Sequence, residues 1–246
     1  MKFRMSNVTR LCATVVATSI LLLPALSRAG TLDSLGALNQ DQFSDLTENL
    51  GAGTHYKGVS PGEGQGLLGF DVGVVLSSTE IDENLFDAGS NGSFDSGQIN
   101  LARVQVLKGL PFGLDIGASL TKSIDTDISI VGAEVRYSLI DGGILTPSLA
   151  VRASYSQMEG VDDLDLSNGA LELTVSKGFV MLTPFAGVGI VQTRAKLDGE
   201  GGLDSETVEQ NKLYVGLTIN LGVAITVEAD QTGDYQSYSA KAGLRF

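Results

Sequence analysis

The sequence has almost no cysteine or histidine, two side chains that many catalytic and metal sites use. Its 246 residues contain one cysteine, one histidine and no tryptophan. The cysteine, Cys12, lies in an amino-terminal segment that we expect to be removed, so no disulfide, thiolate nucleophile or cysteine metal site is predicted. The histidine, His55, is then the one candidate for a general base that works near neutral pH. We expect no cofactor.

Positive charge is also scarce, with 16 Lys and Arg residues against 29 Asp and Glu residues. Three basic residues precede an apolar run over residues 11–26, and Ser27-Arg28-Ala29 fits a small-x-small cleavage site. This order predicts a secretory signal peptide over residues 1–29. The peptide holds four of the bases and none of the acids, so its removal changes the net charge from −13 to −17. Nucleic acid is therefore not an expected partner.

Long apolar runs are missing after the expected signal peptide, and proline is scarce. After the signal peptide, the longest stretches without a charged residue are 213–227 and 178–193, and glycine interrupts both. Neither predicts a membrane-spanning helix, which needs about 20 apolar residues. Proline occurs only 5 times and glycine 31 times, which is typical of many strands and turns and not of disorder. The remaining length suits a single domain.

From Leu67 onward, apolar and polar residues alternate. In the last stretch, Tyr238, Ala240, Ala242, Leu244 and Phe246 share one face, and polar or small residues occupy the other. Period two is typical of a strand that separates two environments, and about ten tilted residues are enough to cross a bilayer. The pattern predicts ten strands, near residues 68–77, 98–108, 112–121, 131–139, 147–155, 171–176, 184–190, 213–221, 223–228 and 235–246.

The connections between these strands indicate a closed barrel. Four are tight turns built on glycine, at residues 108–111, 141–143, 177–179 and 220–222. The others are longer and acidic, over residues 78–97, 122–127, 157–168, 193–210 and 229–233. Transmembrane barrels have such short periplasmic turns and long external loops, whereas a soluble β-sandwich, the alternative fold, has no reason to. We predict an all-β fold: a single-chain antiparallel transmembrane β-barrel of about ten strands over residues 67–246, facing outer-membrane lipids.

The segment before the barrel, residues 30–66, does not alternate. Asn39 and Gln42 resemble a capping box, and Phe43, Leu46 and Leu50 fall on one face of a helix predicted over residues 40–50, with Gly51 as its stop. We expect a periplasmic segment with a short helix. The helix is too short to stand alone, so it must lean on the periplasmic mouth or the lumen of the barrel, unless the segment is a loosely ordered tail.

Several stretches together resemble a group of functionally uncharacterised proteobacterial outer-membrane β-barrel proteins. The resemblance covers nearly the whole chain after the signal peptide and is carried by Phe43-Ser-Asp-Leu-Thr-Glu-Asn-Leu-Gly51, Gly69-Phe-Asp-Val-Gly73, Glu159-Gly-Val-Asp-Asp-Leu-Asp165, Ser176-Lys-Gly-Phe179, Leu182-Thr-Pro-Phe-Ala-Gly-Val-Gly189 and Tyr238-Ser-Ala-Lys-Ala-Gly-Leu-Arg-Phe246. It implies location in the cell outer membrane and casts Tyr238 and Phe246 as part of an insertion signal for the barrel assembly machinery. It brings no catalytic residue with it.

The charged residues at inward positions are compatible with two different functions. The predicted phase turns residues of both signs into the lumen, including Arg103, Asp115, Glu134, Arg136, Arg152, Glu172 and Glu228. Such groups either neutralise one another in a mostly closed interior or line a water-filled passage. We favour the closed interior, because acidic and basic residues alternate from strand to strand. The predicted function is a structural or surface-binding role with a charge-filled lumen, and the alternative is a narrow passive pore for small solutes.

Acidic residues gather in two predicted external loops. One group includes Asp82 and Glu83, and the other holds Asp162, Asp163 and Asp165. Clustered carboxylates can bind divalent cations, although their spacing matches no EF-hand loop and solvated acidic loops are the simpler interpretation. Histidine is absent from the barrel strands and from these loops, where a barrel enzyme would build its site, so we expect no enzyme activity.

Overall fold

The computed structural model describes residues 38–82, 97–126, 128–143, 145–161, 163–197 and 203–246. The expected signal peptide over residues 1–29 lies outside the described residues, as do Glu83 and Asp162. Within the described part, no helix is long and apolar enough to cross a membrane.

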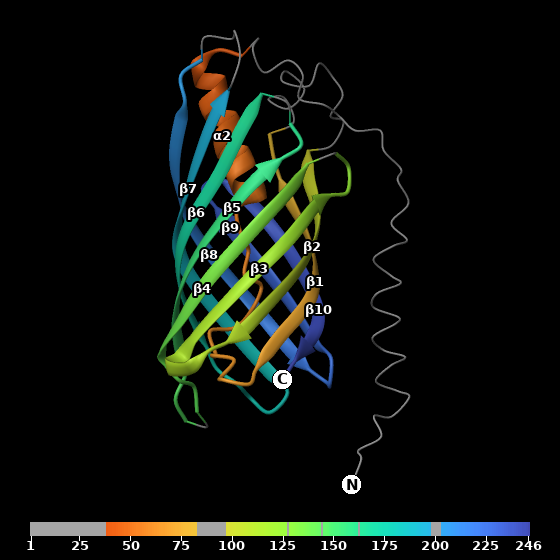
Figure 1. Cartoon of the computed structure of the whole chain (residues 1–246), viewed down its shortest axis with the longest axis vertical. Helices are drawn as coiled ribbons and strands as arrows, with labels where there is room; N and C mark the ends of the chain where they lie inside the picture. The colour runs from red at the N-terminus through yellow and green to blue at the C-terminus, as the bar shows by residue number, and fades with distance from the viewer. Residues whose placement is uncertain (1–37, 83–96, 127, 144, 162, 198–202) are drawn as a thin grey trace.

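Ten antiparallel strands form a closed barrel, as the alternation predicts (Figure 1). Each strand pairs with its neighbours in sequence, and β1 pairs with β10 to close the ring. The strands are β1 Phe70–Glu80, β2 Gln98–Gly109, β3 Leu114–Ser123, β4 Ser129–Ile140, β5 Ser148–Glu159, β6 Leu164–Ser176, β7 Leu182–Leu197, β8 Glu206–Asn220, β9 Ala224–Thr232 and β10 Tyr235–Arg245. Closure leaves no strand edge with unpaired backbone groups.

The predicted faces of the strands agree with the observed burial. In β4, Val131 and Val135 are about half exposed on the outside, while Glu134 and Arg136, on either side of Val135, are buried. The same alternation in the other strands gives the barrel an apolar outer surface that includes Val72, Val74, Leu76, Val104, Val106, Ile116, Leu120, Leu171, Leu173, Val188, Ile190, Leu213, Val215, Ile225, Val227 and Leu244. A continuous apolar surface of this extent is unusual on a soluble monomer and suits contact with lipid.

The two ends of the barrel differ. We call the end with the β2–β3, β4–β5, β6–β7 and β8–β9 connections the turn end, and the opposite end the loop end. The chain terminus Phe246 lies at the turn end, at the bottom of Figure 1. There, a 3-10 turn, η2 Pro111–Gly113, contains Phe112 with a φ of 65°. Phe112 therefore belongs to a turn and not to the third strand, where the alternation had placed it.

At the loop end, the strands run further than predicted. The prediction of long loops over residues 157–168, 193–210 and 229–233 is wrong for most of their length, because β5 to β9 continue through them. Period two persists there with its polarity reversed: Asp165 and Arg194 point outward, whereas Met158, Leu166 and Ala195 are buried inside. The rule that outward residues are apolar does not identify the loop-end parts of these strands, because their outer face is polar.

One helix, α2 Gln40–Thr54, precedes the barrel, and its predicted capping box is present. The Asn39 N–H donates to Gln42 Oε1 at 3.1 Å, and the Gln42 N–H donates to Asn39 Oδ1 at 2.9 Å. The helix continues past Gly51, which was expected to end it. A Cβ at Gly51 would lie 2.1 Å from Thr193 Oγ1 of β7, so this glycine serves close approach to the wall and not helix termination.

The helix lies inside the loop end of the barrel, and the chain then descends through the lumen to the turn end (Figure 1). We call residues 38–66 the luminal segment. Phe43, Leu46 and Leu50 pack there on inward side chains of the loop-end strands, in an apolar cluster that also contains Ile99, Leu101, Ile128, Ile130, Met158, Leu164 and Leu166. Of the two positions considered for the helix, the lumen is the observed one. A periplasmic location was expected for residues 30–66. For residues 38–66 we correct it to the lumen, because the apolar face of α2 is buried in the barrel.

Candidate functional site

The interior below the apolar cluster brings the luminal segment against the charged wall. Six of the seven inward charges named from the sequence carry hydrogen bonds, ion pairs or an aromatic contact there, and all seven are buried. Several groups of contacts, from the turn end toward the loop end, hold residues 55–66 against the wall.

Near the turn end, Arg136 of β4 holds the chain by its backbone. Its guanidinium pairs with Asp115 of β3 at 2.7 Å and donates to the carbonyl oxygens of Pro61 and Glu63, both at 2.9 Å. Asp115 also accepts the N–H of Gln65 at 3.1 Å. A fixed planar donor fork suits this arrangement, in which one cation binds a carboxylate and two carbonyls. The charges of β3 and β4 thus fix the path of the segment.

Midway along the lumen, Arg152 of β5 joins two carboxylates. It lies 3.0 Å from Glu134 of β4 and 3.0 Å from Glu172 of β6, and Glu172 in turn binds Lys212 of β8 at 2.6 Å. Glu134 also accepts the hydroxyl hydrogen of Tyr56 at 3.0 Å. These four charges alternate in sign across β4, β5, β6 and β8, and Glu134 at one end of the chain of charges contacts Tyr56 of the luminal segment.

Gly58 passes directly over this chain of charges. A Cβ placed on it would lie 1.5 Å from Nη1 of Arg152, so no larger residue fits at this distance from the guanidinium. The glycine therefore permits the segment to lie flat against the wall.

The one lysine of the luminal segment, Lys57, is bound to β9 and β10. Its Nζ lies 3.1 Å from Asp230 and donates to Ser237 Oγ at 2.9 Å and to the carbonyl oxygen of Ala52 at 3.1 Å. Burial lowers the pKa of Lys57 to about 8, with Asp230 opposing that shift. At neutral pH the ammonium is still mostly charged, and its partners supply the donors and acceptors that water would provide outside.

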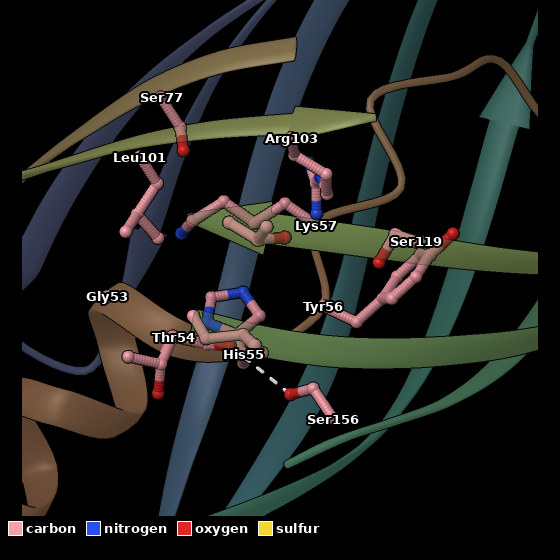
Figure 2. Close-up of a pocket in the computed structure, with 12 residues that line it drawn as sticks. Gly53, Thr54, His55, Tyr56, Lys57, Ser77, Leu101, Arg103, Ser119 and Ser156 are labelled. Atoms are coloured by element: carbon pink, nitrogen blue, oxygen red, sulfur yellow. Dashed lines mark hydrogen bonds between the residues drawn. The ribbon is translucent and has the colours of Figure 1, made fainter. Parts of the chain in front are cut away.

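Above these contacts, His55 and Tyr56 border a small cavity shown in Figure 2. The cavity measures about 10 Å³, space for one water molecule. The guanidinium of Arg103 lies 5.4 Å from the ring centre of Tyr56, in a cation–π contact. Arg103 Nε and Nη2 and His55 Nε2 are buried without a hydrogen-bond partner among the described residues. Figure 2 shows these side chains around one space, reached by Ser77, Ser119 and Ser156 from the wall.

The remaining predicted site residues lie apart from this interior or have no partner within it. Glu228 is buried on β9, and neither of its carboxylate oxygens has a hydrogen-bond partner in the described part of the chain. Asp163 and Asp165 are exposed near the loop end, as is Asp82, whose N–H donates to Asn49 of α2. Among the described residues, no three His, Cys, Asp or Glu side chains are grouped to hold a metal ion.

The two residues assigned to the insertion signal lie on the outer surface. Tyr238 is 56 % exposed and Phe246 is 72 % exposed. The backbone of Phe246 exchanges two hydrogen bonds with Phe70, with N···O distances of 3.0 and 2.6 Å. The last residue of the chain therefore contributes to the closing seam through its backbone while its ring faces outward.

Sequence reasoning missed several partners in the interior. Lys212 and Asp230 lay just outside the predicted strands, and Lys57 and Tyr56 belong to a segment that has no alternation. If the alternation of β9 is continued toward the loop end, Asp230 falls on an inward position. The sequence therefore contained a signal for the position of Asp230. No comparable signal exists for Lys57.

No family model and no curated protein matches the sequence. Solved structures of outer-membrane β-barrels are similar in fold. The β domain of the Bordetella autotransporter BrkA has 12 % identity and a TM-score of 0.46, covering 73 % of this chain and all of that chain. The attachment invasion locus protein Ail of Yersinia pestis has 12 % identity and a TM-score of 0.32, covering 73 % of this chain and 99 % of that chain.

A loop-deletion mutant of OmpT, an outer membrane protein of Vibrio cholerae, has 13 % identity and a TM-score of 0.33. It is matched over 62 % of this chain and 55 % of its own, so this chain spans about half its length. The shared feature in all three is the barrel architecture.

Proposed function

We propose that this protein is an integral outer-membrane barrel whose lumen is closed by residues 38–66, and that it serves a structural or surface-binding role without enzyme activity. The apolar outer surface supports contact with outer-membrane lipids, and the aromatic end of β10 supports recognition by the barrel assembly machinery. The turn end faces the periplasm and the loop end faces outward in this proposal, because bacterial barrels place their short turns inside.

The observation that carries the closed lumen is the attachment of the segment along its whole length. Apolar side chains fix the helix at the loop end, Lys57 binds Asp230 in the middle, and Arg136 binds the backbone at the turn end. A segment held at three levels by buried groups blocks a passage more firmly than a single loop would. A ten-stranded barrel also leaves little width once side chains fill it.

The loop end supports the surface-binding part of the proposal. Strands β6 to β8 extend beyond the apolar outer surface with polar residues outside and the apolar cluster inside. This arrangement suits water and not lipid on the outside, so the barrel is expected to project from the membrane as a rigid wall. A rigid projecting surface is suited to contact with other molecules.

A narrow pore is the second candidate, and one observation favours it. Arg103 and Glu228 are buried with polar atoms that have no hydrogen-bond partner among the described residues. Such groups are normally satisfied by water, and connected waters would give small solutes or ions a route.

Single-channel recording of the refolded protein in planar bilayers separates the two candidates. We expect no resolved conductance steps at pH 7.5 for the wild type. The Arg136→Met variant loses its bonds to Asp115, Pro61 and Glu63, so it should show intermittent openings. Arg194→Met, which changes an exposed arginine on the outside of β7, is the matched control and should stay closed. Steady conductance of the wild type would refute the closed lumen and favour the pore.

A further inference from the structure

The single histidine of the chain is placed where a second proton would be poorly accommodated. His55 follows the last residue of α2, and its Nδ1 lies 3.1 Å from the carbonyl oxygen of Gly51. Because a carbonyl can only accept, Nδ1 carries the hydrogen and Nε2 has the lone pair. The ring is 3 % exposed, and Nε2 has no hydrogen-bond partner among the described residues. It borders the small cavity of Figure 2.

The charged groups around this ring are mainly cations. Lys57 of the segment itself, Lys212 of β8 and Arg103 of β2 all act against a positive charge on His55. The nearby carboxylates have other partners: Asp230 binds Lys57, and Glu134 binds Arg152 and Tyr56. Glu228 of β9 is the buried carboxylate without such a partner among the described residues, and it acts on Arg103 and Lys57. Burial first, and then Lys57, hold the pKa of His55 well below its usual value of 6.5.

We propose that His55 is an acid-sensitive latch: while its Nε2 is unprotonated the luminal segment stays docked, and a proton on Nε2 favours release of the segment from the wall. The geometry that carries this is a buried nitrogen without a hydrogen-bond partner among the described residues, beside a cavity that Lys57 and Arg103 also line, at the joint between α2 and the descending chain. The proposal rests on the closed lumen proposed above, since release has a functional consequence only if the segment closes the passage.

The direction of the effect follows from proton linkage. A released segment exposes His55, which then binds protons with a pKa of about 6.5, whereas the docked ring resists them. Below about pH 6.5 a released His55 holds more protons than the docked one, so this histidine makes acid favour release. If the docked ring stays neutral, the His55 contribution multiplies the equilibrium constant for release by about ten when the pH falls from 7.5 to 5.5. Lys57 is charged in both states over most of this range, so its contribution to the change is small. Glu228 is buried without a partner among the described residues and would reach water on release, so it acts in the opposite direction, and the share of His55 is measured against a variant that keeps Glu228.

Hydrogen–deuterium exchange on the refolded full-length barrel in detergent tests the proposal. The measurement follows backbone amides of residues 50–60 at pH 7.5 and pH 5.5, corrected for the intrinsic pH dependence of exchange. Between pH 7.5 and pH 5.5, the corrected exchange of the wild type should accelerate about ten times more than that of His55→Asn. His55→Asn keeps a donor for the Gly51 carbonyl, cannot be protonated in this range and retains every other titrating group. Its exchange therefore reports the pH response of the segment without the histidine.

A second measurement remains informative if the variant does not fold. In an untagged chain His55 gives the only histidine NMR signals, and in the docked state they should show the neutral Nδ1–H form down to pH 5.5. Ordinary titration near pH 6.5, or equal acceleration of exchange in wild type and His55→Asn, would overturn the latch. Conductance recorded in parallel separates the two proposals: steady ion flow at pH 7.5 refutes the closed lumen, while a lumen closed at both pH values with unchanged exchange refutes only the latch.

Discussion

Replacing Glu172 with glutamine tests whether the interior charges hold the barrel together. Glu172 of β6 is the only carboxylate among the four linked charges midway along the lumen that binds two cations, since its two oxygens bind Arg152 of β5 at 3.0 Å and Lys212 of β8 at 2.6 Å. All three side chains are essentially inaccessible to water, at 0–1 % exposure. The substitution removes the negative charge and leaves the two cations in place.

The structure indicates a large cost for this change. Arg152 keeps Glu134, but Lys212 has no other ion pair among the described residues and is left with the ring of Tyr214 at 5.0 Å. Removing one partner of a buried ion pair typically costs about 3–5 kcal/mol, above the 1–3 kcal/mol for a single unsatisfied polar group. We therefore expect Glu172→Gln to lower the free energy of unfolding by about 3–5 kcal/mol.

Urea unfolding of the refolded barrel in lipid vesicles measures this loss of unfolding free energy, and three further variants serve as comparisons. Glu134→Gln should cost less, because Arg152 retains Glu172 and Tyr56 can still donate to the amide oxygen. Glu209→Gln on the exposed outside of β8 should stay within about 0.5 kcal/mol of the wild type. Adding Lys212→Met to Glu172→Gln removes the stranded cation and should recover about 1 kcal/mol or more. A loss below 0.5 kcal/mol for Glu172→Gln, with anion-selective ion flow, would show instead that water screens these charges.

Three further outcomes follow from the fold. Protease added to intact cells should cut in the β1–β2 connection, residues 81–97, and spare the turn at residues 221–223; mass spectrometry identifies the sites, and cleavage confined to the turns would invert the topology. Deleting Phe246 removes two backbone hydrogen bonds to Phe70 and an aromatic end, and should impair assembly as seen by heat-modifiable migration on gels; normal assembly would contradict a role in insertion. Gly58→Ala should displace the segment from Arg152 and increase ion conductance, while Gly169→Ala, where a Cβ would meet nothing within 4 Å, should not; equal behaviour of the two would count against the fit of the segment.

The sequence predicted the barrel well where one physical rule dominates. Alternation of apolar and polar residues identified all ten strands and the inward positions of Glu134, Arg136 and Arg152, because lipid outside and charge inside leave a strong period-two signal. The rule failed where the environment changes: Asp165 and Arg194 lie on strands whose outside is polar, so they were read as loops.

The helix was predictable, while its position was not. The capping residues Asn39 and Gln42 are local signals that fix where the helix begins. Its place in the lumen depends on contacts such as Lys57 with Asp230, which are 173 residues apart in the chain. Nothing in the local sequence of the segment distinguishes a buried lysine from an exposed one, and only the closed wall around it supplies the partners.

Contacts between the start and the end of the chain also constrain the order of assembly. Asn49 donates to the Tyr235 hydroxyl and Lys57 to Ser237, and Arg245 donates to the carbonyl oxygen of Glu63, across separations of 186, 180 and 182 residues. The luminal segment therefore has no complete docking surface until the final strand has been made and delivered to the membrane. An amphipathic helix and several charged groups lack their complete set of partners while the first nine strands form. The seam between β1 and β10 then has to close around them. Filling of the interior and completion of the ring are thus one late event, and a chaperone that shields the amino-terminal region would act during that interval.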